Sequence, residues 1–528
     1  MNKGTQTAKA SEIFSRLRGF RDILFTEAAR RERIVNAVSS YFAGAGYELV
    51  ETPSVENPAT LLVGQQDLSN TFRFVDVDGK LIALRSDVTG SLARVVATRF
   101  SLIDPPYRLR YVADVFQEQE SLRGSDRQQT QLGLECYGLT SDEGDLEVLG
   151  LALGGMRAAG LEGVRLHVSD VRLLEHLSSD KVELLALRGG LELFDKLQAQ
   201  VDSGAKQALE DLRRCFEALA DLTGQDTCEI VADFSLQPAH DYYSGLIFEL
   251  YAMQSDGRYR SIGRGGRYDQ LIELYGRKMP ASGFMYDLTS LETVAASFEE
   301  AAEQDSLTKG ATVPLRIAVP KGKLYDECID LLVRAGLDVP GLDTPGRALR
   351  LANDKYEIII AKPTDVAIYV SRGVADIGIS GLDTLVEADF PLLQLLDLQF
   401  GGCEFAIAAP EGMDCSLDEL SLRLGTIRVA TKYPRLTQRY FDERGVQVEI
   451  VKLNGNIELA PLIGISDLIV DLVQTGTTLR ENNLRVLEPM LSSTGRFVAH
   501  PTAARTDSRV LELAERLEAL LESSEPQC

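Results

Sequence analysis

The chain has 528 residues, of which 45% are hydrophobic and 25% are charged, and its formal net charge is −24. This length exceeds what one hydrophobic core supports, so we expect two to four domains of ordinary globular composition. The acidic balance argues against general nucleic-acid binding, which needs a basic face, and it confines any phosphate site to a local positive pocket. Seven cysteines without CxxC pairs and four histidines indicate reduced thiols rather than disulfides or structural zinc. Neither a signal peptide nor a membrane-spanning stretch is expected, which predicts a cytoplasmic protein.

The first elements alternate helical and extended patterns. Residues 26–45 predict an amphipathic helix with Ile34, Val38 and Phe42 on one face, and residues 46–56 predict a turn and a strand. Residues 85–89 precede a second helix. Further stretches at residues 107–118, 131–135, 241–249 and 262–269 contain Gly-rich turns and aromatic pairs, which taken singly are usually structural.

In series, these segments resemble the catalytic core of histidyl-tRNA synthetase, from residue 18 to about residue 291. The resemblance implies a class II aminoacyl-tRNA synthetase-like core built on an antiparallel sheet, which we assign to a domain of residues 1–291.

Three departures from that family concern cations at the ATP site. Gln117 stands where the family has its motif 2 arginine, Pro238-Ala-His240 replaces Arg-Gly-Leu, and Ser290 occupies the place of the motif 3 arginine. Cations that stabilise negative charge on ATP commonly carry much of the rate. We therefore expect no adenylation chemistry.

The amino-acid pocket, in contrast, keeps its polar residues. Carboxylates suit an ammonium or imidazolium group, while glutamine and tyrosine supply directional hydrogen bonds. The pattern resembles the regulatory subunit that pairs with short-form ATP phosphoribosyltransferase, and it implies an allosteric histidine site. The alternative is that these side chains are packed in a satisfied core network. The predicted histidine-binding residues are Asp87, Thr89, Gln117, Gln131, Glu135, Tyr242 and Tyr243.

The second half of the chain has an alternating α/β pattern. Residues 292–314 are rich in Ala, Glu, Ser and Gln; their start extends a helix and their end is typical of a linker. Residues 315–324 predict strand, turn and helix start, strands follow at residues 358–361 and 377–379, and an amphipathic helix follows residue 507.

One stretch in this half has the pattern of a phosphate site. Residues 468–473 are an apolar run broken only by Asp471, followed by Thr475-Gly-Thr-Thr478, with Thr478 as the expected helix N-cap. Backbone N–H groups at such a helix start bind anions. The alternative is a core strand with an ordinary turn.

With residues 429–434 and 453–464, this stretch resembles the signature of ATP phosphoribosyltransferase, over residues 315–528. The resemblance implies a two-lobed α/β unit like a type II periplasmic binding protein. Lobe I covers about residues 315–405 and 489–528, and lobe II covers about residues 406–488. The fold class is thus α/β and α+β multidomain, a fusion of two proteins that are usually separate.

The resemblance implies transfer of phosphoribose from phosphoribosyl pyrophosphate (PRPP) to N1 of ATP, with release of pyrophosphate, at the start of histidine biosynthesis. It implies that Asp471 and Glu458 hold the ribose hydroxyls or magnesium carried by the substrates, with no metal fixed by protein alone, while Thr475, Gly476, Thr477 and Thr478 bind the 5-phosphate. The catalytic residues are Lys323, Arg347, Asp471 and Glu458. The ATP-binding residues are Lys321, Lys323, Arg347, Ser380, Gly381, Asp383 and Lys432.

Two departures and two alternatives accompany this assignment. Family members often have arginine at position 323, and Leu382 stands where lysine is frequent. The polar residues could instead be solvated surface groups, above all Lys323 and Lys432. Two other functions are possible: a solute receptor without chemistry, and a tRNA-binding or tRNA-charging protein. We expect a homo-oligomer that binds neither nucleic acid nor membrane.

Overall fold

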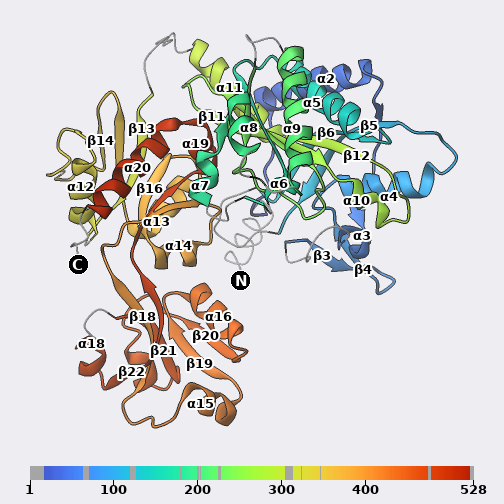
Figure 1. Ribbon diagram of the computed structural model, residues 1–528. Helices are drawn as coiled ribbons and strands as arrows, with labels where there is room; N and C mark the ends of the chain where they lie inside the picture. Colours follow the sequence, from blue (N-terminus) through green and yellow to red (C-terminus); the bar gives the residue numbers. More distant parts are fainter. Residues whose placement is uncertain are drawn as a thin grey trace, which may run out of the picture. The chain divides into compact units, whose positions relative to one another are not determined.

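The computed structural model describes residues 17–62, 70–118, 126–174, 176–177, 181–198, 201, 204–223, 228–303, 313–322, 324–344, 346–473 and 477–523. The chain forms two compact units, Met1–Lys309 and Gly310–Cys528, which we call the N-terminal and the C-terminal unit (Figure 1). The domain boundaries inferred from the sequence remain predictions. The first part of the expected linker belongs to a helix that ends at Glu303.

The N-terminal unit is built on a sheet that has nine strands within the described residues. Its central strands pair antiparallel, while the β1–β5 and β7–β9 pairs are parallel. A smaller sheet has the order β2(Val55–Glu56), β4(Leu81–Leu84) and β3(Arg73–Val75). In sheet order, the large sheet contains β1(Glu48–Leu49), β5(Tyr107–Phe116), β6(Gln128–Tyr137), β12(Ala281–Asp287), β11(Tyr259–Arg267), β10(Leu246–Met253), β7(Val164–Asp170), β9(Cys228–Asp233) and β8(Arg188–Gly189).

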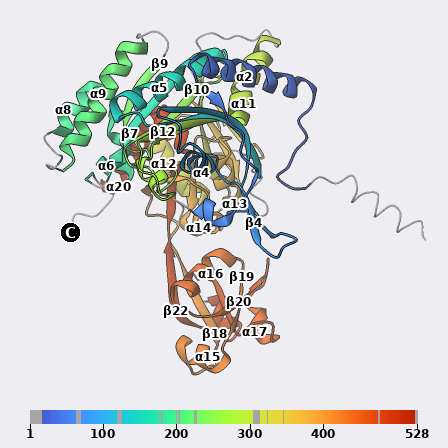
Figure 2. The same cartoon turned by 90° about the vertical axis from the view of Figure 1, so that its right-hand side faces the viewer.

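The strands of this sheet have apolar side chains on both faces, and helices pack against these side chains. Figure 2 shows the long helices α2, α5, α9 and α11 gathered over one face, where they form the larger core with the sheet. Helix α4 and tyrosines of the strands form a second core. The helices are α2(Phe25–Gly44), α3(Pro58–Leu62), α4(Thr89–Arg99), α5(Ser141–Ala158), α6(Val171–Leu174), α7(Lys181–Ala186), α8(Leu191–Gln198), α9(Lys206–Thr223), α10(Asp269–Glu273) and α11(Leu288–Glu303).

The C-terminal unit contains two α/β lobes, each with its own sheet. In sheet order, lobe I has β14(Arg350–Ala352), β15(Tyr356–Ala361), β13(Leu315–Pro320), β16(Ile377–Gly381), β23(Gly495–Ala499) and β17(Leu393–Asp397), with helices α12(Tyr325–Arg334), α13(Pro363–Ser371), α14(Leu382–Ala388), α19(Pro501–Thr506) and α20(Ser508–Glu522). Lobe II has β20(Val448–Lys452), β19(Ile427–Thr431), β21(Leu468–Val473), β18(Cys403–Pro410) and β22(Leu484–Ser493), with helices α15(Leu417–Leu424), α16(Pro434–Glu443), α17(Leu459–Leu462) and α18(Thr477–Glu481).

The two lobes repeat one arrangement of strands. Three parallel strands, β15-β13-β16 in lobe I and β20-β19-β21 in lobe II, are followed by an antiparallel strand, β23 or β18. Both antiparallel strands come from the connections between the lobes, which pass from β17 to β18 and return from β22 to β23. Parallel strands end at the same edge of a sheet, so the residues that follow them are brought together.

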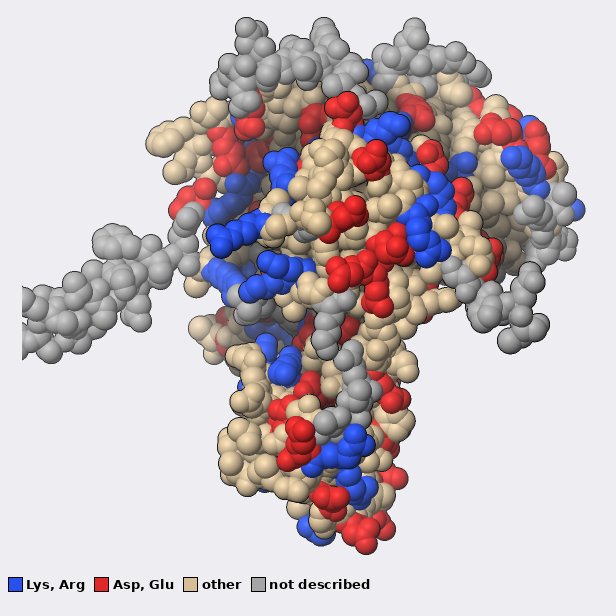
Figure 3. Space-filling model, turned by 90° about the vertical axis from the view of Figure 1, so that its left-hand side faces the viewer, with Lys and Arg blue, Asp and Glu red and all other residues tan. Residues whose placement is uncertain are grey.

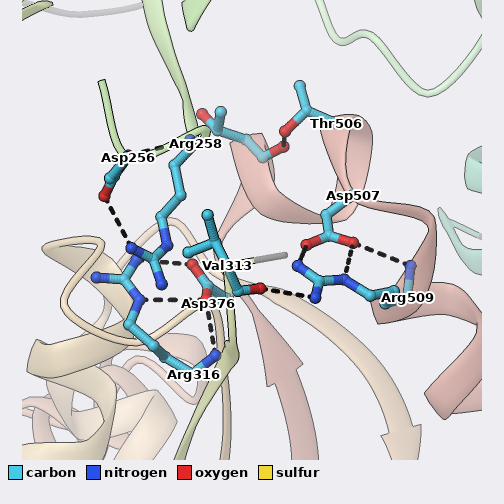
Figure 4. Close-up of polar contacts among 9 residues, drawn as sticks. Asp256, Arg258, Val313, Arg316, Asp376, Thr506, Asp507 and Arg509 are labelled. Atoms are coloured by element: carbon cyan, nitrogen blue, oxygen red, sulfur yellow. Dashed lines mark hydrogen bonds and ion pairs between the residues drawn. The ribbon is translucent and has the colours of Figure 1, made fainter. Parts of the chain in front are cut away.

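A repeated ion pair joins two neighbouring parallel strands in each lobe, β13 with β16 in lobe I and β19 with β21 in lobe II. The backbone N–H of Arg316 donates to Asp376 Oδ2 (2.8 Å), and its guanidinium donates to Asp376 Oδ1 (2.7 Å; Figure 4). Arg428 makes the same two contacts with Asp467, at 2.9 and 2.8 Å. Each aspartate immediately precedes its strand, so the pair fixes the strands relative to each other where they begin.

Helix starts follow local sequence signals. Ser416 and Glu419 form a reciprocal capping box at the start of α15. Proline occupies the first turn of α13, α16 and α19, where its missing N–H costs nothing. Asp507 caps α20 and binds the guanidinium of Arg509, which also donates to the Val313 carbonyl (Figure 4).

The predicted fold class is confirmed. The helix expected at residues 26–45 is α2, which buries the three predicted side chains, and the helix expected after residue 507 is α20. One local prediction is wrong: α18 begins at Thr477, so Thr478 is its second residue and not its N-cap. The helix starts two residues earlier than the hydroxyl pattern indicated.

We expect Asp376→Asn to lower the free energy of unfolding of the C-terminal unit by about 1–3 kcal/mol, because a mostly buried guanidinium loses its charged partner. Arg316 and Asp376 are 18% and 11% exposed. Urea unfolding of the full chain, followed by circular dichroism, measures the effect. Asp330→Asn, in an exposed ion pair with Arg334, is the control and should change stability by less than about 0.5 kcal/mol. Equal stability of the two variants would contradict the structural role of the pair.

Candidate functional site

Two carboxylates and a lysine meet at the strand ends of lobe II. Thr431 at the end of β19 lies opposite Val470, so Lys432 and Asp471 come together, with Lys432 Nζ 3.9 Å from Asp471 Oδ2. Burial raises the pKa of Asp471; Lys432 opposes that rise and Glu458 adds to it. In the cluster of Lys432, Glu458 and Asp471, the two carboxylates can accept hydrogen bonds from sugar hydroxyls or bind the metal of a substrate complex.

The turn after β21 falls largely outside the described residues. Thr475, Gly476 and the side chain of Thr477 lie there, so their predicted contact with a phosphate stays a prediction. Thr478 is exposed in the first turn of α18, which buries Leu479. The strand that carries Asp471 ends at Val473, and the helix begins at Thr477.

The strand ends of lobe I carry lysines. Pro320 at the end of β13 lies opposite Ala361 at the end of β15, so the next residues, Lys321 and Lys362, are neighbours at the same edge, and both are exposed. Sequence reasoning identified Lys321 and missed Lys362; the signal was its place after a strand parallel to β13. Lys323 lies outside the described residues.

The other predicted ATP-binding residues of lobe I differ in exposure. Arg347 is exposed, and its side chain makes no hydrogen bond or ion pair with a described residue. Ser380 is fully buried and Gly381 is the N-cap of α14. Asp383 is also buried: its N–H donates to Ser493 Oγ (3.0 Å), which donates back to Asp383 Oδ1 (2.9 Å). The Asp383 side chain thus ties α14 to the strand that returns from lobe II.

One contact between the lobes had no local sequence signal. The carboxylate of Glu387, at the end of α14 in lobe I, accepts hydrogen bonds from the backbone N–H groups of Arg435 (3.1 Å) and Leu436 (3.0 Å), in the first turn of α16 in lobe II. Arg435 donates in return to the carbonyl of Ala388 (3.2 Å). A carboxylate at a helix N-terminus is favourable, so this contact stabilises the arrangement of the two strand edges.

The N-terminal unit contains a polar pocket that gathers all the predicted histidine-binding residues except one. Asp87, Thr89, Gln117, Gln131, Tyr242 and Tyr243 line it. Sequence reasoning missed the other lining residues, which come from separate strands and loops and include Tyr111, His240, Arg264 and Tyr268. Glycine at position 266 leaves room for the lining residue Tyr243, because a Cβ there would lie 2.9 Å from Tyr243 Cε1.

Glu135 is the exception. It is 1% exposed and lies behind the wall, where it accepts hydrogen bonds from Thr89 Oγ1 (2.8 Å) and from the Tyr268 hydroxyl. Burial raises the pKa of Glu135 to about 8. A Cβ at Gly283 on the next strand would overlap the Glu135 carboxylate, so glycine is required there. Glu135 therefore orients pocket residues rather than lining the pocket.

The polar atoms of the pocket wall are incompletely satisfied. Gln131 is 7% exposed, and its Oε1 has no hydrogen-bond partner among the described residues. Among the described residues, Asp87 accepts only long hydrogen bonds, from Tyr242 (3.5 Å) and the Gly90 N–H (3.4 Å). The His240 ring stacks on Tyr242, with the ring centroids 4.9 Å apart and the planes inclined by 10°. The pocket thus offers acceptors and an aromatic face.

Charge and composition limit other kinds of site. Within the described residues, His, Cys, Asp and Glu side chains form no group of three that could hold a metal ion. The described helices include none with the length and apolar character needed to cross a membrane. The face drawn in Figure 3 mixes acidic with basic side chains, which differs from the continuous basic surface of a nucleic-acid-binding protein.

Fold and site together define a two-lobed α/β enzyme unit joined to a class II synthetase-like unit with a polar pocket. The ATP phosphoribosyltransferase family model matches residues 362–519, and the histidyl-tRNA synthetase family model matches residues 19–184 and 178–291. The chain is 48% identical over 203 residues to an ATP phosphoribosyltransferase of Moorella thermoacetica, covering 37% of this chain and 88% of that one. It is 43% identical over 211 residues to one of Halalkalibacterium halodurans, covering 39% and 97%.

The chain therefore belongs to the ATP phosphoribosyltransferase family, which are pentosyltransferases, and carries a histidyl-tRNA synthetase family unit at its N-terminus. This confirms the predicted fusion and enzyme class. Among solved structures, an ATP phosphoribosyltransferase regulatory subunit/histidyl-tRNA synthetase from Bacillus halodurans is 22% identical, with a TM-score of 0.49, covering 66% of this chain and 93% of that one. An ATP phosphoribosyl transferase complex from Thermotoga maritima is 33% identical, with a TM-score of 0.35, covering 40% and 100%.

We expect Glu135→Gln to stabilise the protein relative to wild type progressively from pH 5 to pH 8. An unfolded glutamate ionises near pH ~4.3, whereas Glu135 holds its proton to about pH 8 when folded. The unfolded state therefore binds fewer protons in this window, so wild-type stability falls as the pH rises, by at most ~1.4 kcal/mol per pH unit from this group. Thermal unfolding at pH 5, 6, 7 and 8 measures the difference. The exposed Glu143→Gln variant is the control and should have the stability of wild type at each pH. A stability difference between Glu135→Gln and wild type that stayed constant from pH 5 to pH 8 would contradict the raised pKa of Glu135.

Proposed function

We propose that the C-terminal unit catalyses the first step of histidine biosynthesis, in which ATP and PRPP form N1-(5-phosphoribosyl)-ATP and pyrophosphate. The observation that carries this proposal is the cluster of Lys432, Glu458 and Asp471 at the edge where β21 leads into α18. This arrangement suits a sugar phosphate, because carboxylates face its hydroxyls while a helix start follows within a few residues.

The chemistry requires alignment and charge stabilisation more than proton transfer. The bond from C1 of the ribose to pyrophosphate breaks as the bond to adenine N1 forms, so positive charge develops on the sugar and negative charge on the leaving group. Adenine N1 is unprotonated at neutral pH and needs no base. Lys321, Lys362 and Arg347 supply cations in lobe I, and Lys323 adds a fourth by sequence. Holding both substrates in line supplies the rest.

The remaining site residues take roles around these groups. Asp471 and Glu458 bind the ribose hydroxyls, or Mg²⁺ carried by the substrates, which the polyphosphates require for charge neutralisation. Thr475 to Thr478 bind the 5-phosphate through N–H and hydroxyl groups. Ser380 and Asp383 hydrogen-bond to internal partners, and so do the backbone N–H groups of Leu382 and Asp383, so this segment supports the start of α14 rather than donating to ATP.

We propose that the N-terminal unit binds histidine and thereby inhibits the reaction. The pocket joins Asp87 with Gln131 and an aromatic stack, a combination that suits an amino acid with a ring side chain. The synthetase arginines for ATP are absent at Gln117 and Ser290, so binding stops short of adenylation. By linkage, histidine and substrate weaken each other equally when the effect is on affinity. We place the working protein in the cytoplasm as a homo-oligomer.

We expect Asp471→Asn to lower kcat/KM for PRPP by roughly 10²-fold or more, because an amide loses the charge that holds the hydroxyls or magnesium. Pyrophosphate release from ATP, PRPP and Mg²⁺ measures the reaction. Asp442→Asn, an exposed carboxylate on α16 that hydrogen-bonds Gln438, is the matched control and should retain wild-type kinetics. Turnover by Asp471→Asn at the wild-type rate would exclude the site, and substrate binding without turnover by wild type would favour a receptor.

We expect removal of residues 1–305 to abolish inhibition by histidine, since the proposed receptor is then absent. The same pyrophosphate assay, with and without histidine, measures the result. Where the fragment lacks activity of its own, Asp87→Asn in the full chain replaces it and should raise the histidine concentration for half-inhibition by about tenfold or more. Undiminished inhibition of the fragment would overturn the regulatory assignment.

A further inference from the structure

The histidine pocket contains one cation whose role is unassigned. Arg264 extends from β11, where it lies opposite Met285 of β12, and both residues line the pocket. Arg264 is exposed, and within the described part of the chain its guanidinium has no hydrogen bond or ion pair. A guanidinium carries five donors in a planar fork that matches a carboxylate. Its donors are therefore available to an anionic group at the mouth of the pocket.

The opposite charge lies on another wall of the pocket. Asp87, just before α4, is 9% exposed, and its hydrogen bonds of 3.4 and 3.5 Å exceed the 2.7–2.9 Å or so that charged donors reach. Its carboxylate keeps capacity for a stronger donor. Both charges act on the His240 ring. Burial lowers the pKa of His240, Asp87 opposes that effect and Arg264 adds to it.

Two further polar atoms indicate that the pocket is made for a polar ligand. Gln131 Oε1 and Ser86 Oγ are buried without hydrogen-bond partners among the described residues, and both residues line the pocket. Leaving such groups unsatisfied costs free energy, which a ligand that supplies hydrogen-bond partners would recover.

We propose that Arg264 binds the carboxylate of the amino acid while Asp87 binds its ammonium group, so that the pocket recognises both charges of the zwitterion. This inference rests on the proposed histidine site and adds the residue that distinguishes an amino acid from its decarboxylated or reduced analogues. Arg264 is then a specificity determinant: an analogue without a carboxylate retains the contacts with Asp87, Gln131 and the His240–Tyr242 stack but loses this one.

The test compares histidine with histidinol, in which a hydroxymethyl group replaces the carboxylate, by calorimetric titration of the full-length chain. We expect Arg264→Gln to weaken histidine binding by about 10- to 100-fold, the loss for a charge-assisted hydrogen bond, and to change histidinol binding by less than about threefold. Arg264→Lys keeps the charge without the fork and should recover part of the loss. Arg99→Gln, an exposed arginine at the end of α4, is the matched control and should bind both ligands as wild type does.

Different outcomes separate the two proposals. Equal weakening of histidine and histidinol by Arg264→Gln, or an unchanged affinity for histidine, would overturn the role of Arg264 while leaving feedback inhibition intact. If wild type bound neither compound, the histidine site itself would fail and the role of Arg264 with it. Because the Arg264 side chain is exposed, we expect Arg264→Gln to unfold at the same temperature as wild type. That result would exclude misfolding as the cause of weaker histidine binding.

Discussion

The arrangement of the catalytic unit depends on a guanidinium–carboxylate pair that occurs once in each lobe. Arg316 with Asp376 joins the beginnings of β13 and β16, and Arg428 with Asp467 joins those of β19 and β21. Because strand length is similar across the three strands, alignment at one end is transmitted to the other, where Lys321 and Lys432 emerge. The geometry of the strand edges that carry the candidate site residues thus depends on contacts at the opposite ends of the strands.

The N-terminal unit has a different requirement, which is to hold charged groups next to aromatic side chains. Gly266 and Gly283 lack side chains where Tyr243 and Glu135 need the space, so the sheet itself makes room for the pocket. Behind the wall, burial keeps Glu135 protonated near neutral pH, so it orients Thr89 and Tyr268 without adding a second negative charge beside Asp87. The pocket then presents one carboxylate and one guanidinium rather than an excess of either.

The sequence predicted what local patterns and family signatures encode. The run ending in Asp471 and the helix buried through Ile34, Val38 and Phe42 are periodic and short-range, so they could be identified directly. Lys362, Arg264 and Glu387 could not, because their importance arises from strand register or from a contact between lobes that lie far apart in sequence. Asp383 was assigned to a ligand from its motif, whereas its side chain is held by Ser493 across 110 residues. Motifs identify residue types; pairing decides which way each side chain faces.

The two connections between the lobes have a mechanical consequence. The path from β17 to β18 and the return through Thr494 from β22 to β23 run side by side, because Asp397 pairs with Arg496 and Cys403 with Ser493. Two adjacent antiparallel connections act as a hinge, about which the lobes can rotate relative to each other. The hydrogen bonds between Glu387 and the start of α16 also join the two lobes, so a rotation that separates the lobes must break them. A rotation of this kind would separate the two strand edges and leave the side chains of each half of the candidate site in place.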